Sequence, residues 1–287
     1  DLSAARFGDP EGPSLDSHWQ HCPSVAMAGA HRCACVRCPD PGTMLPVTLR
    51  TRILCTAGLG LLVVWGVALV LSRSMALGAV YPWVSVSLFA AIVTLVIGFS
   101  SRHPFQSFGP GNHVTLLRAA LLALMGGFIL EPAGVGIAAA AVVGGISSIL
   151  LDGLDGQLAR RSGLASDYGA RFDMETDAAT VLVLSLLVWQ HDKAGYWVLA
   201  GGLMRYAFVA AGWAWPWVRQ PFVPTLRGRL VAIAHLVGLT VALAPFVLMP
   251  CSAAVAALTL SALAWSFGLD LLRLWRGETG YYTDVSS

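Results

Sequence analysis

The apolar residues of this chain are grouped in long blocks, and these blocks restrict its fold more than any other feature. Each block holds 17 to 21 residues, close to the roughly 20 that an α-helix needs to cross a bilayer. Hydrophobic residues make up 56% and charged residues 12% of the 287 residues, as in membrane proteins. We therefore predict an all-α, polytopic membrane protein with eight spans, at 53–72, 79–99, 114–130, 133–151, 169–189, 195–215, 230–249 and 253–272.

Basic residues predict the orientation of these spans. If Arg50 and Arg52 lie in the cytoplasm, eleven arginines lie on that side, and only Arg73 and Lys193 lie on the other. We therefore expect both termini on the cytoplasmic side of a plasma (inner) membrane. The net charge of +2 reflects the same asymmetry, so it gives no reason to expect nucleic acid as a partner.

Four aspartates lie beside two of the spans. Asp152 and Asp155 are three residues apart and Asp173 and Asp177 four apart, so each pair projects from one face of its own helix. A charge at membrane depth costs roughly 2.5 to 3.5 kcal/mol, so the group needs a cation. Carboxylates without His or Cys favour Mg²⁺, Mn²⁺ or Ca²⁺ over zinc. Helix caps and surface charges are the alternative, but they do not explain why Asp177 lies two turns into an apolar helix.

Small residues leave room beside these aspartates. Gly156 and Ala159 follow Asp152 by four and seven residues, and Gly169 thins the facing helix. Arg160, four residues after Gly156, would point a cation at the same cleft. This arrangement suits a phosphate held beside metal ions.

Together these eight positions resemble, without a mismatch, the signature of the CDP-alcohol phosphotransferase family, D-x2-D-G-x2-A-R-x8-G-x3-D-x3-D. Enzymes of this family are embedded in the membrane through six helices, transfer a substituted phosphate from a CDP-linked donor to an alcohol, and release CMP. The resemblance covers roughly residues 110–276. It implies a six-helix catalytic domain at 101–276, two extra N-terminal helices at 51–100 and a polar cytoplasmic tail at 277–287.

The resemblance also implies roles for the matching residues. The implied ligands of Mg²⁺ or Mn²⁺ are Asp152, Asp155, Asp173 and Asp177. Asp177 is in addition the implied catalytic base. The residues implied to line the nucleotide and its diphosphate are Gly156, Ala159, Arg160 and Gly169.

A second motif, N-x-x-T-x-x-R, opens the third span with Asn112, Thr115 and Arg118. It is similar to the entrance of the first core helix in the same family, where polar residues lie near the nucleotide. We therefore expect Asn112 and Thr115 to contact the nucleotide. The alternative is an amphipathic lead-in from which Arg118 extends to the lipid headgroups.

Several charged residues fall within the later spans. An intramembrane arginine should face protein or water, and the resemblance suggests that Arg205 and Arg229 contact a phosphorylated acceptor or a lipid headgroup. Asp270 is the alternative partner of Arg205. His235 and Asp270 should otherwise form hydrogen bonds between helices. Glu175 lies on another helix face from the aspartates, and we expect a plain interfacial position for it.

The first 50 residues are rich in Pro, Gly, Ser and Ala and show no helical or strand period. We expect a disordered leader, or one translated from too early a start, with Met27 or Met44 as the true beginning. A zinc site is the alternative, formed by Cys22, Cys33, Cys35 and Cys38. Their spacing matches no pattern known to us, and no cleavable signal peptide is visible.

We therefore predict a transferase of substituted phosphate groups in phospholipid biosynthesis, which moves a phosphatidyl group from CDP-diacylglycerol to an alcohol. CDP-choline or CDP-ethanolamine, with diacylglycerol as acceptor, would use the same aspartates. A divalent-cation transporter and a membrane scaffold are alternatives from other classes; a transporter should show broken helices and polar residues on a path to the far side. The expected partners are the CDP-linked donor, the alcohol acceptor and the lipid bilayer, and a homodimer is left open.

Overall fold

The structure is a computed structural model that describes residues 47–99, 110–162, 167–215 and 225–276. The chain divides into two units, Asp1–Thr43 and Met44–Ser287, and all described residues belong to the second. The cysteine cluster of the predicted leader and the predicted tail at 277–287 lie outside the described residues.

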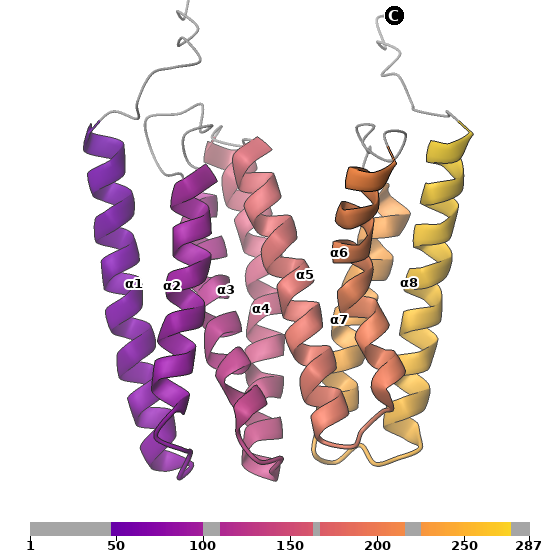
Figure 1. The fold of residues 1–287 in the computed structure, drawn as a ribbon, viewed down its shortest axis with the longest axis horizontal. Helices are drawn as coiled ribbons and strands as arrows, with labels where there is room; N and C mark the ends of the chain where they lie inside the picture. Colours follow the sequence, from indigo (N-terminus) through magenta and orange to yellow (C-terminus); the bar gives the residue numbers. More distant parts are fainter. Residues whose placement is uncertain (1–46, 100–109, 163–166, 216–224, 277–287) are drawn as a thin grey trace, which may run out of the picture. The chain divides into compact units, whose positions relative to one another are not determined.

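The described residues form eight α-helices and two short 3₁₀ helices (Figure 1), which confirms the predicted all-α class. The α-helices are α1 (Val47–Ser74), α2 (Tyr81–Phe99), α3 (Pro110–Gly127), α4 (Val135–Ser162), α5 (Asp167–Gln190), α6 (Leu199–Ala214), α7 (Leu226–Leu243) and α8 (Cys251–Trp275). The 3₁₀ helices are η2 (Phe128–Leu130) and η3 (Tyr196–Val198).

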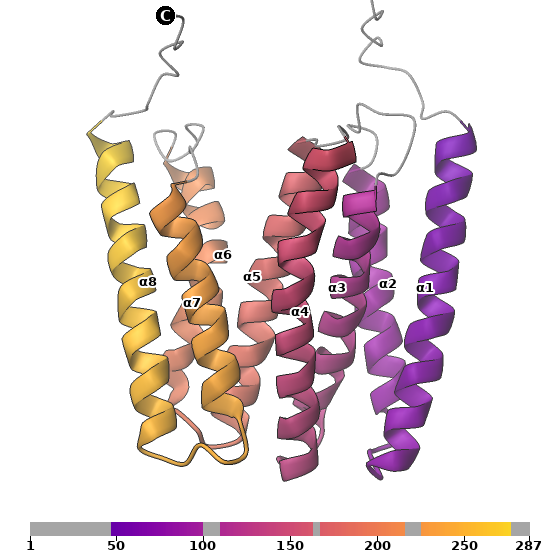
Figure 2. The same cartoon turned by 180° about the vertical axis from the view of Figure 1, so that it is seen from behind.

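Successive helices run in opposite directions, so the helix ends gather at two levels (Figures 1 and 2). The connections α1–α2, α3–α4, α5–α6 and α7–α8 lie at one level, which we call the connection end. The starts of α5 and α7 and the ends of α4 and α8 lie at the other level, which we call the aspartate end because it includes Asp152 and Asp173. The first described turn of α1 and the last of α8 therefore lie at the same end.

Among the described residues, five helices are long and apolar enough to cross a membrane, by length and composition. Their apolar stretches are Cys55–Ser74, His113–Leu130, Val135–Leu154, Leu226–Leu243 and Cys251–Trp275. The other three predicted spans are also helices, but they do not meet the criteria of length and apolar composition. The apolar part of α2 is shorter, α6 has 16 residues, and the first half of α5 carries five charged residues. The chain is an integral membrane protein.

The helix bounds differ from the predicted spans where polar residues decide them. Helix α7 begins at Leu226, four residues before the predicted span, because the Thr225 hydroxyl accepts a hydrogen bond from the Gly228 N–H at 3.1 Å and caps the helix. Helix α4 continues to Ser162, eleven residues past the predicted end of its span. Its polar last turns therefore carry the first aspartate pair on a continuous helix.

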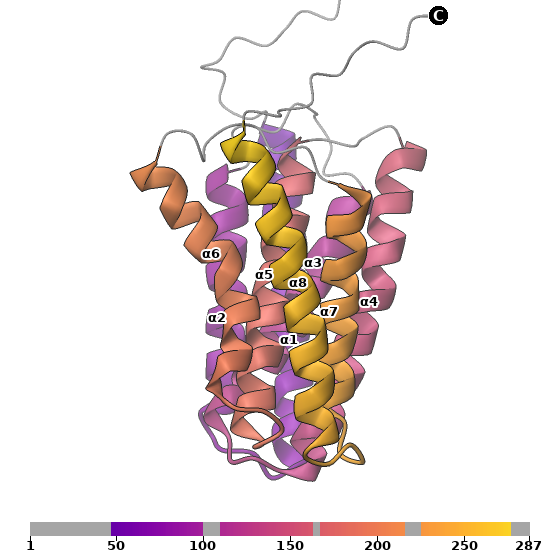
Figure 3. The same ribbon diagram turned by 90° about the vertical axis from the view of Figure 1, so that its right-hand side faces the viewer.

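Two groups of buried side chains hold the helices together. The first joins α3, α4, α5 and α7 through residues such as Met125, Leu184 and Leu239. The second joins α1 and α2 to α3 and reaches Phe172 on α5. Seen from the α8 side (Figure 3), α7 lies between α8 and α4. The two N-terminal helices are thus packed directly onto helices of the predicted six-helix core, α3 to α8.

Polar contacts add to this packing at the connection end. The Gly78 N–H donates to the buried Glu131 carboxylate at 2.9 Å, and the Lys193 ammonium donates to the Val247 carbonyl at 2.5 Å. These contacts tie the α1–α2 connection to the α3–α4 connection, and the α5–α6 connection to the α7–α8 connection. Between α7 and α8, His235 Nδ1 lies 3.1 Å from the Thr259 hydroxyl oxygen, which confirms the predicted interhelical hydrogen bond.

Candidate active site

The first half of α5 carries a buried face and a polar face side by side. Phe172, Thr176 and Thr180 recur every four residues and are buried. The hydroxyls of Thr176 and Thr180 donate to backbone carbonyls one turn earlier, at 2.9 and 2.8 Å, so both are satisfied within the helix. Asp173 and Asp177 each follow a buried residue by one position. They therefore project from the edge of the buried face, close to the neighbouring helices.

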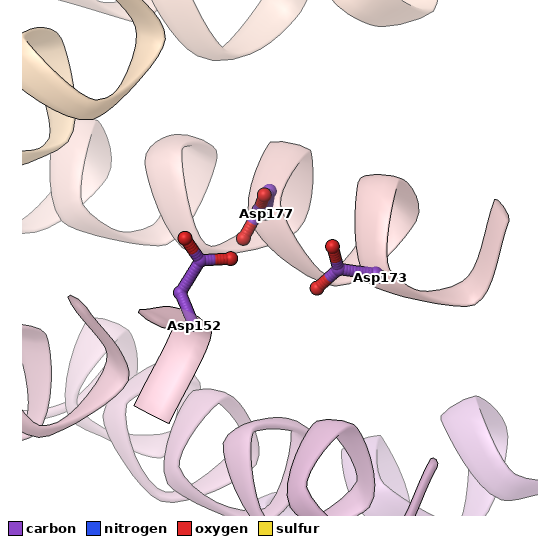
Figure 4. Close-up of side chains that lie close together, drawn as sticks. All are labelled: Asp152, Asp173 and Asp177. Carbon is purple, nitrogen blue, oxygen red and sulfur yellow. The ribbon is translucent and has the colours of Figure 1, made fainter. Parts of the chain in front are cut away.

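Asp152 on α4 meets this pair on α5 (Figure 4). One carboxylate oxygen from each of Asp152, Asp173 and Asp177 lies within 4.8 Å of the other two. The side chains are 16%, 35% and 42% exposed, in that order. The structure thus brings together three of the four predicted metal ligands from two helices, in a half-buried group that ligands can reach.

The chemistry of this aspartate group fits a hard divalent cation. Every donor atom is a carboxylate oxygen, the ligand type that Mg²⁺ and Mn²⁺ prefer, and the group includes neither His nor Cys. Oxygens within 4.8 Å of one another can share one ion, because ligand-to-metal distances of about 2.1 Å place two ligands within about 4.2 Å. A small closure of the group would therefore let the three carboxylates share one ion.

Arg118 on α3 lies at the centre of the aspartate group. Its side chain is fully buried. One guanidinium nitrogen, Nη1, lies 3.2 Å from Asp152 and also donates to Asp173, while the second, Nη2, donates to Asp177. The alternative in which Arg118 extends to the lipid headgroups is therefore wrong. The sequence motif placed this arginine near the site but did not indicate its partners.

Most of the predicted nucleotide-binding positions lie outside the residues whose side chains the structure describes. These positions are Asn112 in α3 and Gly156, Ala159 and Arg160 in α4. The side chain of Asp155, the fourth predicted metal ligand, also lies outside them. Thr115 is buried one turn before Arg118, and Gly169 lies in the first turn of α5, one turn before Asp173. Gly169 therefore lies within one turn of the aspartate group on α5, and Thr115 lies one turn from the arginine of α3 that contacts the group.

The predicted acceptor residues lie elsewhere. Arg205 on α6 pairs with Glu175 on α5 at 2.5 Å. Glu175 is two residues from each aspartate of α5 and thus lies on another face of that helix. Asp270 on α8 pairs with Arg227 at 2.5 Å, so the interpretation of Asp270 as the partner of Arg205 is wrong. Arg229 is exposed at the start of α7.

A comparison with protein families identifies a family for this chain. The family model described as CDP-alcohol phosphatidyltransferase matches residues 110–269, more than half of the chain. The match begins at the start of α3 and ends within α8, so it includes Arg118 and the aspartate group and leaves out α1 and α2. No curated protein and no solved structure matches the chain.

Proposed function

The chain belongs to the CDP-alcohol phosphatidyltransferase family, and from this we propose that it transfers a phosphatidyl group from CDP-diacylglycerol to an alcohol and releases CMP. The family uses a CDP-linked donor and an alcohol acceptor in a membrane. Beyond this, we propose that the donor is CDP-diacylglycerol and that the reaction belongs to phospholipid biosynthesis. A lipid-linked donor is favoured because the aspartate group lies between helices of an integral membrane protein.

The observation that carries the proposal is the convergence of Asp152, Asp173 and Asp177 from two helices. We propose that these carboxylates hold Mg²⁺ or Mn²⁺, with Asp155 as a further ligand. A divalent ion held there would neutralise the donor diphosphate and stabilise the CMP that leaves. The carboxylates come from two helices that are packed against a common core, so they would hold the ion, and with it the diphosphate, at a fixed place.

We assign the role of base to Asp177. Its side chain is the most exposed of the three aspartates, at 42% against 16% for Asp152, so an acceptor hydroxyl can approach it. In the proposed step the acceptor oxygen forms a bond to the phosphorus of the phosphatidyl group. The bond from that phosphorus to the CMP oxygen breaks, and the hydroxyl proton goes to the Asp177 carboxylate. No covalent intermediate with a side chain is needed.

The remaining predicted site residues complete the proposal. The residues that we propose to line the nucleotide and its diphosphate are Asn112, Thr115, Gly156, Ala159, Arg160 and Gly169. Arg205 and Arg229 are the proposed acceptor contacts, which suits an acceptor that carries a phosphate. The homodimer stays an open alternative.

We further propose that the aspartate end faces the cytoplasm across a plasma (inner) membrane. Several described arginines lie at that end, among them Arg171, Arg227 and Arg273, whereas Arg73 and Lys193 lie toward the connection end. Arginine and lysine are enriched in cytoplasmic segments. Cysteine labelling from either side of the membrane, at Cys251 of the connection end and at a cysteine placed at Arg276, would test this orientation.

The experiment that tests the proposed function follows CMP release by the purified protein in detergent. The donors are CDP-diacylglycerol, CDP-choline and CDP-ethanolamine, each offered with phosphorylated and unphosphorylated alcohols and with diacylglycerol. We expect CMP only from CDP-diacylglycerol, and only with Mg²⁺ or Mn²⁺ present. Release of CMP from CDP-choline with diacylglycerol as acceptor would contradict CDP-diacylglycerol as the donor and make CDP-choline the donor instead. If no donor releases CMP and the protein carries Mn²⁺ into proteoliposomes, the proposed transferase activity would be wrong and the protein would act as a transporter.

A further inference from the structure

Arg118 and a divalent cation would use the same three carboxylates. The guanidinium contacts one oxygen, Oδ1, of each of Asp152, Asp173 and Asp177. Arginine keeps its positive charge at any pH that a protein tolerates. One positive and three negative charges give these four side chains a net charge of −2. A single divalent cation would neutralise this charge.

The geometry points to a competition between Arg118 and the metal: we propose that Arg118 holds the three carboxylates together and at the same time weakens their affinity for the divalent cation. This inference rests on the metal site of the proposed function. It makes Arg118 a positioning residue that sets metal affinity. The guanidinium occupies one oxygen of each carboxylate, and its charge repels a second cation placed only a few ångströms away.

Burial makes this competition strong. The Arg118 side chain is fully buried, whereas the three carboxylates are partly exposed. Charges removed from water are screened less than surface charges, so the repulsion between the guanidinium and an incoming cation is retained at physiological salt. The buried guanidinium contacts all three carboxylates, so it stays with the aspartates unless the metal displaces it from some of them.

Arg118 would also couple the binding of the metal to the binding of the donor. A donor diphosphate brings negative charge to the site, and it can accept hydrogen bonds from a guanidinium. Diphosphate binding would thus both attract the metal and give Arg118 an alternative partner. Metal affinity should therefore rise when a CDP-linked compound is bound, and by linkage the compound should bind more tightly with the metal.

The chain offers a matched control in Arg227. This arginine donates to the buried carboxylate of Asp270 at 2.5 Å, between α7 and α8. Its loss removes an ion pair between helices without touching the aspartate group. A merely structural role for Arg118 predicts the same behaviour for both arginines.

The test measures Mn²⁺ binding to the full-length protein in detergent, from the free-Mn²⁺ signal in electron paramagnetic resonance, with and without CDP. Thermal unfolding is followed in EDTA and in saturating Mn²⁺. Arg118→Gln should bind Mn²⁺ more tightly than the wild type, on the order of tenfold, and its loss of thermal stability in EDTA should largely disappear in Mn²⁺. Arg227→Gln should keep the wild-type affinity for Mn²⁺ and lose equal stability in both conditions.

Arg118→Lys keeps the charge, but a single ammonium cannot bridge the carboxylates as a guanidinium does. Its Mn²⁺ affinity should lie between those of the wild type and Arg118→Gln, and it serves as the test if Arg118→Gln does not fold. Unchanged or weaker Mn²⁺ binding by the folded Arg118 variants would overturn the inference while leaving the proposed function in place. A wild type that binds no Mn²⁺, with or without CDP, would overturn both.

Discussion

Arg205 of α6 donates a hydrogen bond to Glu175 of α5, with a nitrogen-to-oxygen distance of 2.5 Å. The two side chains are 29% and 51% exposed, and an ion pair with this exposure contributes less than about 1 kcal/mol to stability. The pair joins two helices, but it holds Arg205 only weakly. An acceptor phosphate could therefore take the guanidinium from Glu175 at little cost.

Replacement of Arg205 by Gln should raise the KM for a phosphorylated acceptor by roughly tenfold, equivalent to about 1.4 kcal/mol of lost binding. The KM for the donor and the thermal stability should change little. Glu175→Gln is the matched control, because it removes the same ion pair but keeps the guanidinium, so the acceptor KM should not rise. If both variants raise it equally, the pair is structural and Arg205 does not bind the acceptor.

The pair between Arg227 and Asp270 should behave differently, because Asp270 is only 7% exposed and Ser266 also accepts from Arg227 at 3.3 Å. Arg227→Gln leaves a buried carboxylate without its main partner. We expect a loss of about 3 kcal/mol, at the low end for such pairs because Arg273 lies 4.0 Å from the same carboxylate. Asp270→Asn should restore part of that loss in the double variant, measured by unfolding in detergent. A double variant as unstable as the sum of both single variants would contradict this account.

The close approach of α5 and α6 depends on Gly202. A Cβ atom at this position would lie 2.5 Å from the Leu182 Cα, and backbone atoms cannot move aside as a flexible side chain can. Gly202→Ala should therefore destabilise the protein by about 1 to 3 kcal/mol, as overpacking usually does. Gly66→Ala is the control, because nothing lies within 4 Å of its Cβ, and the helix preference of alanine should leave stability equal or higher. Equal losses in both variants would contradict the close approach.

Apolar blocks predicted the eight helices because a membrane leaves few other ways to satisfy the backbone. The same blocks did not predict the helix ends that polar residues determine. The start of α7 depends on one hydroxyl, that of Thr225, which caps the helix. The extension of α4 to Ser162 crosses a polar stretch that hydropathy reads as a loop. Helix ends of this kind depend on polar residues and local hydrogen bonds, and the positions of the apolar residues do not reveal these.

Spacing predicted that the aspartates face each other, because residues three or four apart share a helix face. The role of Arg118 did not follow from any local pattern. Its partners Asp173 and Asp177 lie 55 and 59 residues further along the chain, and only the packing of α3 against α5 brings them together. Arg205 shows the same limit, because its partner Glu175 is 30 residues away on a neighbouring helix. Pairing of charges between helices depends on which helices are neighbours.

The roles assigned to the aspartates predict different defects. Asp152→Asn and Asp173→Asn should weaken Mn²⁺ binding and lower turnover at least about a hundredfold, since each removes one negative charge from the metal site. Asp177→Asn should weaken Mn²⁺ binding less than these two variants, because Asp177 is the most exposed of the three ligands, and should still stop turnover, because it removes the base. Mn²⁺ binding and CMP release, measured on the same preparations, separate the two kinds of defect. An Asp177→Asn variant that loses metal binding as fully as the other two would make Asp177 a metal ligand without a separate role as base.

The most direct test of the central claim is CMP release from CDP-diacylglycerol by the purified wild type and the Asp173→Asn variant, before and after chelation and with Mn²⁺ added back. We predict that wild-type release stops on thorough chelation and returns with Mn²⁺, while Asp173→Asn shows almost no release in any condition. Release that survives chelation, or an Asp173→Asn variant that keeps most of the wild-type rate, would contradict a metal-dependent transfer at the aspartate group.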